Sequence, residues 1–168
     1  MPHESRLDQS LRQLLQGRRT AALATLQAPA DGSAPQPAIA IPMASLVPYA
    51  VDTAAGALVI HVSALAAHTR NMRQASLVSL LIAAPEQEQQ PVHALERVSI
   101  LGLATPLAPP DLDGSRRVYL ARFPEAEPMT ALDDFCFVRI TPLAARHVAG
   151  FGAARDLTAE ELKAMLAP

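Results

Sequence analysis

The sequence is poor in aromatic residues, in cysteine and in lysine. Its 168 residues include no tryptophan, one cysteine and only 4% aromatic residues. A single cysteine, Cys136, excludes an internal disulfide and any cysteine-rich metal site. Its apolar neighbours predict that it is a small core residue. All basic residues except Lys163 are arginine, which we attribute, with the abundance of alanine, to genomic composition.

Long apolar runs and an excess of charge of one sign are also absent. The formal net charge is −2, and the lack of a basic stripe argues against a nucleic-acid partner. No segment approaches the roughly 20 apolar residues that cross a bilayer, and the polar N-terminus lacks a signal-peptide core. We therefore expect a cytoplasmic protein without membrane contact. Half of the residues are hydrophobic, which predicts one domain over residues 1–168 with a proper core.

Helical signals occur at the start, middle and end of the chain. Leucines recur at helical spacing over residues 4–16, and Gly17 is expected to end this N-terminal helix, residues 1–17. Further helices are expected at 64–74 and 112–123. A capping box that starts at Thr158 predicts a C-terminal helix within residues 157–168.

Short apolar runs between turn signals predict strands. These runs lie at 20–26, 38–41, 57–62, 77–83, 97–104 and 134–140. A turn at 30–33 makes the first two a hairpin, Gly102 suggests a bulge, and Pro142 is expected to end the last strand. Without βαβ alternation or an internal repeat, the pattern favours a closed or nearly closed antiparallel barrel of about six strands with peripheral helices, an α+β chain that is mainly β.

The polar segment 63–71 (SALAAHTRN) directly follows the strand predicted at 57–62. A serine at the end of a strand can cap the helix that follows, and the free N–H groups of a helix start attract anions. Side chains of Ser63, Thr69 and Arg70 could add hydrogen bonds to a phosphate. An ordinary capped surface helix explains the same residues, so the segment alone leaves both interpretations open.

Motifs for metal binding or protein-borne catalysis are missing. The histidines form no HxxxH or HExxH pair, and His61 alternates within a strand. The patterns GxxxxGK[ST] and GxSxG do not occur, and Gly150 and Gly152 lack the third glycine of a dinucleotide fingerprint. We therefore expect no metal site. Such a protein either binds a ligand without chemistry or holds a cofactor that reacts.

Four blocks together carry a family resemblance over about residues 18–157. They are ALATL at 22–26 before the Asp31-Gly32 turn, VSALAAHTRNM at 62–72, RVSILGLA at 97–104, and Asp134-Phe135 followed by VAGFGAA at 148–154. In this order they resemble the pyridoxamine-phosphate-oxidase-like flavin-binding split barrels, in particular the haem-utilisation subgroup. The block at 62–72 is the most specific.

The resemblance implies a six-stranded antiparallel split barrel of the FMN-binding type and a homodimer with two FMN sites between its subunits. Candidate contacts to the phosphate and ribityl chain are Ser63, His68, Thr69, Arg70 and Asn71, and Arg97 is a candidate contact to the ring or phosphate. The implied function is an FMN-dependent oxidoreductase of unknown substrate, in which the flavin performs the redox step. A flavin-binding module without catalysis is an alternative.

The sequence departs from the family pattern at two places. Ala75 and Ser76 stand where the family usually has Asp-Pro or Asn-Pro. The Arg-Lys pair of the true oxidase is not found near Ser63, and only His68 aligns with its lysine. We therefore do not expect vitamin B6 oxidation. In the haem-utilisation subgroup a C-terminal histidine can bind haem, and His147 is the nearest candidate, with a packing role equally open. The second alternative is thus a haem-binding protein without flavin chemistry.

Overall fold

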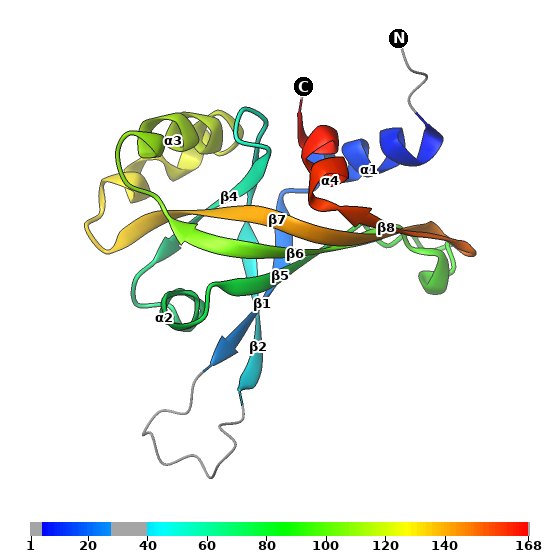
Figure 1. The fold of residues 1–168 in the computed structure, drawn as a ribbon, viewed down its shortest axis with the longest axis horizontal. Helices are drawn as coiled ribbons and strands as arrows, with labels where there is room; N and C mark the ends of the chain where they lie inside the picture. The colour runs from blue at the N-terminus through cyan, green and yellow to red at the C-terminus, as the bar shows by residue number, and fades with distance from the viewer. Residues whose placement is uncertain (1–4, 28–39, 168) are drawn as a thin grey trace.

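The computed structural model describes residues 5–27 and 40–167, which form one antiparallel sheet with helices around it (Figure 1). Its strands are β1 (Thr20–Gln27), β2 (Ile41–Pro48), β3 (Ala50–Asp52), β4 (Ala57–Ser63), β5 (Leu77–Ala83), β6 (Arg97–Pro106), β7 (Phe135–Gly150) and β8 (Ala153–Thr158). The helices are α1 (Arg6–Gly17), α2 (Ala67–Gln74), α3 (Asp111–Arg122) and α4 (Ala159–Leu166), with short 3-10 helices η1 (Val92–Ala94) and η2 (Pro124–Ala131).

The sheet curls so that its two outer strands meet. The strand order is β2–β1–β5–β6–β7–β4–β3, with β8 paired to β7. The outermost strands, β2 and β3, follow one another in the chain with only Tyr49 between them. Tyr49 is fully buried, and its hydroxyl donates a hydrogen bond to the Leu15 carbonyl of α1 at 2.7 Å. Within the described ranges no ladder joins β2 to β3, so the sheet remains open between these two strands.

The mainly β architecture with peripheral helices is confirmed, and the expected strand count is corrected. The sheet of the described residues has eight strands, where the sequence and the family resemblance predicted six. One extra strand is β3, which has three residues and pairs with β4. The other is β8, which pairs with an extension of β7 that the sequence did not predict.

Pro142 does not end β7, contrary to the expectation from the sequence. The strand runs from Phe135 to Gly150, and Pro142 lies opposite Gly102 of β6, where the register shifts. A bulge interrupts the regular hydrogen-bond ladder, so a residue without an N–H is tolerated there. A Cβ atom on Gly102 would lie 2.8 Å from Ile140 Cγ2 and 2.9 Å from the Thr141 carbonyl oxygen. Close approach of β7 therefore requires glycine at the predicted bulge.

The predicted β1–β2 hairpin is confirmed as an antiparallel pair, but its second strand lies later in the chain. β2 spans Ile41–Pro48, whereas the sequence suggested 38–41. Its prolines, Pro42 and Pro48, occur on an outermost strand, where a missing ladder hydrogen bond is tolerated. The turn predicted at 30–33 lies outside the described residues.

Helices α1 and α4 close the barrel core on one side of β7 and β8, where they lie side by side (Figure 1). Leucines 11, 15, 162 and 166 of these helices are fully buried against inward residues of the strands. The predicted capping box is confirmed, because Thr158 and Glu161 exchange the two expected hydrogen bonds. The alternation of the strands leaves the other face of β1, β2, β5 and β6 exposed.

Candidate functional site

The end of β4 holds Ser63 in a turn and not at a helix N-cap. The Ser63 hydroxyl donates to Asp134 Oδ2 at 3.0 Å and accepts from the Leu65 N–H at 3.1 Å. Helix α2 starts only at Ala67, and Ala66 occupies the cap position without a side-chain hydrogen bond. The expectation that Ser63 caps this helix is therefore wrong: the Asp134 carboxylate and the following turn occupy its hydroxyl instead.

Three other residues of the 63–71 block hydrogen-bond to the chain itself. The Thr69 hydroxyl donates to the Ser63 carbonyl at 2.7 Å, and Arg70 Nη1 donates to the Leu65 carbonyl at 2.6 Å. Asn71 is buried, and its Nδ2 donates to Thr25 Oγ1 on β1 at 2.9 Å. These bonds fasten α2 to the ends of β4 and β1. Thr69 and Asn71 would have to exchange these partners before they could hold a phosphate, whereas the bond of Arg70 uses only its Nη1.

His68 is half-buried in the first turn of α2. Burial lowers the pKa of its imidazole below the usual value of 6.5, because removal from water disfavours the charged form. The ring is therefore neutral at pH 7. No hydrogen bond to this ring occurs within residues 5–27 and 40–167, which makes its nitrogens available to a ligand.

Arg97 lies far from the 63–71 block along the sheet. Ser63 pairs with Phe135 at the start of β7, whereas Arg97 pairs with Val148 near its end. At about 3.3 Å per residue, these partner positions are separated by roughly 40 Å of strand. One chain therefore does not bring Arg97 and Ser63 to the same small ligand.

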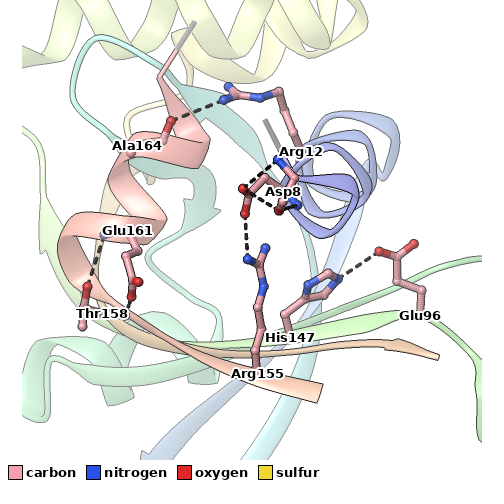
Figure 2. A network of polar contacts seen from close by, with 9 residues as sticks. Asp8, Arg12, Glu96, His147, Arg155, Thr158, Glu161 and Ala164 are labelled. Carbon is pink, nitrogen blue, oxygen red and sulfur yellow. Dashed lines mark hydrogen bonds and ion pairs between the residues drawn. The ribbon is translucent and has the colours of Figure 1, made fainter. Parts of the chain in front are cut away.

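His147 points inward beneath α1, as Figure 2 shows. Its side chain is 0% exposed, and Nε2 lies 2.9 Å from Glu96 Oε1. Ser10 of α1 donates to the same carboxylate oxygen at 2.5 Å, so the pair fastens the helix to the sheet. The neighbouring Arg155 of β8 also points to α1 and donates to Asp8 at 2.7 Å. This position favours the packing role for His147.

The outward face of the sheet carries an unusual number of exposed leucines. We call them the outer leucine face: Leu26, Leu46, Leu77, Leu81, Leu101 and Leu103. Between them lie small residues, since Ala24 pairs with Ser79 and with Ala44, and Leu101 pairs with Ser79 and with Ala144. Small side chains in the middle of the face make a flat, mostly apolar floor.

Two arginines border this face on β6 and β7. Arg97 and Arg146 flank Ser99: Arg97 precedes it by two positions on β6, and Arg146 is its cross-strand partner on β7. Both side chains share the outward face with Leu101, because positions of the same parity on a strand point the same way. Arg146 was missed from the sequence, since β7 was expected to end before it; only the alternation of residues 144–148 signals its direction.

Two adjoining cavities lie on this face, and Arg146 is the arginine that lines one of them. The first, about 330 Å³, is lined by Ser99, Leu101 and Ala144, with Arg146 and Asp156 at its rim. The second, about 190 Å³, lies between β1 and β5. Because Ser79 and Leu101 line both, the two form one shallow groove. Its walls are largely apolar, and its charged groups lie at one end, as is typical of ligand sites.

A larger cleft, about 740 Å³, lies between α3 and the turn after β3. Its polar groups already bind one another: Ser115 donates to the buried Asp52 at 2.9 Å, and Arg139 pairs with Asp111 at 3.2 Å. Volume alone therefore does not make it the better candidate. The groove on the outer face combines exposed apolar surface with the Arg146 guanidinium, and we take it as the candidate site.

No helix within the two described ranges is long and apolar enough to span a bilayer. In the same ranges, no three side chains of histidine, cysteine, aspartate or glutamate cluster as metal ligands would. The candidate site is an apolar groove with Arg146 and Asp156 in its lining, and Arg97 lies beside Arg146 on the same face.

An antiparallel β-barrel with peripheral helices and a shallow, largely apolar groove on its outer face is the class of protein that this fold and site define. The model of the family described as "CREG, beta-barrel" matches residues 4–163, and the chain belongs to this family. It is 34% identical over 113 residues to the chloroplastic heme oxygenase HOZ of Arabidopsis thaliana, an alignment that covers 67% of this chain and 33% of the relative.

Solved structures share the fold. A heme binding protein from Mycobacterium smegmatis superposes with a TM-score of 0.80 at 27% identity, over 96% of this chain and 62% of that one. A putative pyridoxamine 5'-phosphate oxidase from Listeria innocua superposes with a TM-score of 0.56 at 17% identity, over 86% and 99% of the two chains. The suspected family resemblance is confirmed. The chain spans a third of the length of HOZ and about three fifths of the mycobacterial protein.

Proposed function

We propose that this protein binds haem, as the haem-utilisation alternative predicts. The observation that carries the proposal is the match over 96% of the chain to a heme binding protein, at 27% identity and a TM-score of 0.80. The 34% identity to a heme oxygenase from a plant supports the same ligand class. Flavin chemistry has no comparable support among these relatives.

The groove fits the chemistry of haem. A porphyrin is a flat, largely apolar ring with two carboxylates on one edge. The flat floor of alanine and serine between the outer leucines suits the ring face. Arg97 and Arg146 at one end of this face offer charge-assisted hydrogen bonds to carboxylates. When bound, the iron of haem would supply the redox chemistry, and the chain would hold and orient the ring.

The described histidines differ in their access to a ligand. His147 is fully buried and bound to Glu96, and His61 is buried among Phe135, Phe137 and Tyr119. His68 is half-buried and His93 is exposed. We therefore propose His68 and His93, ahead of His147, as candidates to contact the iron, either in one chain or across an interface.

We further propose that the protein is a homodimer joined through the outer leucine face. Six exposed leucines on one side of a sheet form an apolar surface of the kind that marks an interface. A second copy over this face would enclose the groove. It would also supply the residues of the 63–71 block that one chain places far from Arg97.

The test is a titration of the purified full chain with haemin, in parallel with FMN. Haemin is expected to give a saturable Soret band and a thermal stabilisation of about 2.7 kcal/mol at a hundredfold excess over Kd. FMN is expected to give no quenching of its fluorescence and no stabilisation. Tight FMN binding without a Soret change would instead support the FMN-dependent oxidoreductase that the family resemblance implied.

A matched pair of variants tests whether haemin binds in the groove. Leu101→Glu introduces a carboxylate at the floor shared by the two cavities, and haemin affinity is expected to fall tenfold or more, because ligand binding would bury an unpaired charge. Leu132→Glu, on an exposed leucine after η2, is expected to leave haemin affinity unchanged. Equal effects of the two variants would remove the groove from the proposal.

A further inference from the structure

The Arg146–Asp156 pair lies beside the groove and is exposed to solvent. Arg146 Nη1 donates to both carboxylate oxygens of Asp156, at 2.8 and 3.0 Å. The two side chains are 59% and 76% exposed, and exposed ion pairs of this kind contribute little to stability. The guanidinium can therefore exchange this partner for another carboxylate at small cost.

Residues on the two faces of β7 and β8 make different contacts. His147 of β7 and Arg155 of β8 are cross-strand partners that point to α1 and fasten it (Figure 2). Arg146 and Asp156, each one position away, are also partners but point to the groove. Since the strands are already held by the inward pair, the outward pair is not needed to place α1.

Arg97 lies outside the lining of the groove, but the strand register makes it the diagonal neighbour of Arg146, because Arg97 pairs with Val148. Arg97 Nη1 donates to the Leu95 carbonyl at 2.9 Å, which leaves its other N–H groups for a ligand. Diagonal neighbours on adjacent antiparallel strands have Cα atoms about 7–8 Å apart. With Asp156 included, these three groups carry one net positive charge, which complements a ligand that presents carboxylates.

We propose that Arg146, supported by the neighbouring Arg97, makes a carboxylate-recognising end of the groove that selects porphyrins with free propionates, and that Asp156 competes with the ligand for Arg146. This inference rests on the proposed haem function, which it deepens by naming the part of the ligand that is recognised. Arg146 acts by direct contact with the carboxylate, and Asp156 sets how readily that contact forms.

The experiment compares haemin with its dimethyl ester, which keeps the ring and the iron but removes both carboxylate charges. The wild-type chain is expected to prefer haemin by tenfold or more. Arg146→Ala is expected to lose about tenfold in haemin affinity and most of this preference, because the ester makes no charge-assisted bond. Arg146→Lys is expected to keep part of both, since lysine retains the charge without the planar fork.

Asp156→Asn gives a change of opposite sign. It removes the competing charge, so haemin affinity is expected to rise by about threefold while ester affinity stays constant. A merely structural role of the pair would lower affinity in both variants. Arg117→Ala, on the exposed arginine of α3, serves as the control for loss of one positive charge and is expected to change neither affinity.

The outcomes separate the two proposals. If the wild type binds haemin and its ester equally, or if Arg146→Ala keeps the wild-type preference, the carboxylate end is overturned while haem binding stands. If the wild type does not bind haemin, iron-free protoporphyrin IX is titrated by its fluorescence. Binding that depends on Arg146 would then support the carboxylate end alone, and no binding would overturn both proposals.

Discussion

Ser63 of β4 and Arg97 of β6 pair with opposite ends of the same strand, β7, because Ser63 pairs with Phe135 and Arg97 pairs with Val148. The strand between these partners measures roughly 40 Å at its usual rise. The family resemblance assigned both residues to one cofactor. Within one chain they cannot contact the same small ligand, and a site that uses both needs the second copy proposed above.

Gly102 is predicted to be intolerant of any side chain. A Cβ atom there would lie 2.8 Å from Ile140 Cγ2 and 2.9 Å from the Thr141 carbonyl oxygen. Neither atom belongs to the flexible end of a long side chain, so the contact is relieved only by movement of β7. We expect Gly102→Ala to lower the free energy of unfolding by about 1–3 kcal/mol, measured by urea denaturation.

The control for this prediction is Gly114→Ala. Gly114 lies within α3, and no atom lies within 4 Å of the position its Cβ would take. Alanine favours a helix by about 1 kcal/mol over glycine, so this variant is expected to gain stability. Equal losses in both variants would show that the bulge at Gly102 is not the cause.

Local signals in the sequence predicted most elements of the fold but not their continuation. The capping box at Thr158, the leucine stripe of α1 and the bulge at Gly102 are properties of neighbouring residues, and each is confirmed. The passage of β7 through Pro142 depends on Gly102 across the sheet, 40 positions earlier in the chain. Local propensity carries no information about that partner, and the end of the strand was therefore predicted too early in the chain.

The candidate site was harder to predict for the same reason. The polar residues of 63–71 form a compact block in the sequence and therefore predicted a site. In the fold, Ser63 hydrogen-bonds to Asp134 and Asn71 hydrogen-bonds to Thr25. Arg146 lies beyond the residue at which the sequence predicted the end of β7. The face of the sheet to which its side chain points follows only from its pairing with Ser99. Chemistry that is assembled from several strands is not visible in any one segment.

His147 is predicted to stabilise the fold and not to hold haem iron. Its ring is 0% exposed, and Nε2 lies 2.9 Å from the Glu96 carboxylate, which also binds Ser10. We expect His147→Ala to lower the free energy of unfolding by about 1.5–3 kcal/mol, the range for a hydrogen bond to a charged group. Haemin affinity and the Soret maximum of the folded variant should match the wild type.

The control is His93→Ala, on an exposed histidine of η1, for which we expect no change in stability. A lost or shifted Soret band in His147→Ala, at a temperature where the variant is folded, would contradict this prediction and support His147 as a ligand of the haem iron.

Stability is predicted to decrease as the pH falls below about 6.5. Burial lowers the pKa of both His61 and His68 from 6.5, and Arg116 adds a smaller lowering at His61. The folded state then binds fewer protons than the unfolded state between the lowered values and 6.5. Since stability rises with pH where the unfolded state binds more protons, this contribution is complete above 6.5 and is lost as the pH falls through the folded pKa values.

Urea denaturation at a series of pH values between 5 and 8 measures this dependence. His61 packs against the rings of Phe137 and Phe135, with centroids at 4.4 and 5.0 Å, so His61→Phe can keep the ring packing while it removes a titrating group. The slope of stability against pH is expected to be smaller in this variant. An unchanged slope would assign the dependence to other groups.

The outer leucine face is predicted to be the dimer interface. Leu77 and Leu103 are cross-strand partners on β5 and β6, and both are exposed in the single chain. A charge at the centre of an apolar interface is costly, because association would bury it without a partner. We expect Leu103→Glu to shift the protein from dimer to monomer in analytical ultracentrifugation, with little loss of folding, since the side chain is solvated in the monomer. Leu132→Glu, on an exposed leucine after η2, should remain dimeric. A monomeric wild type, or a dimer that survives Leu103→Glu, would show that this face is not the interface.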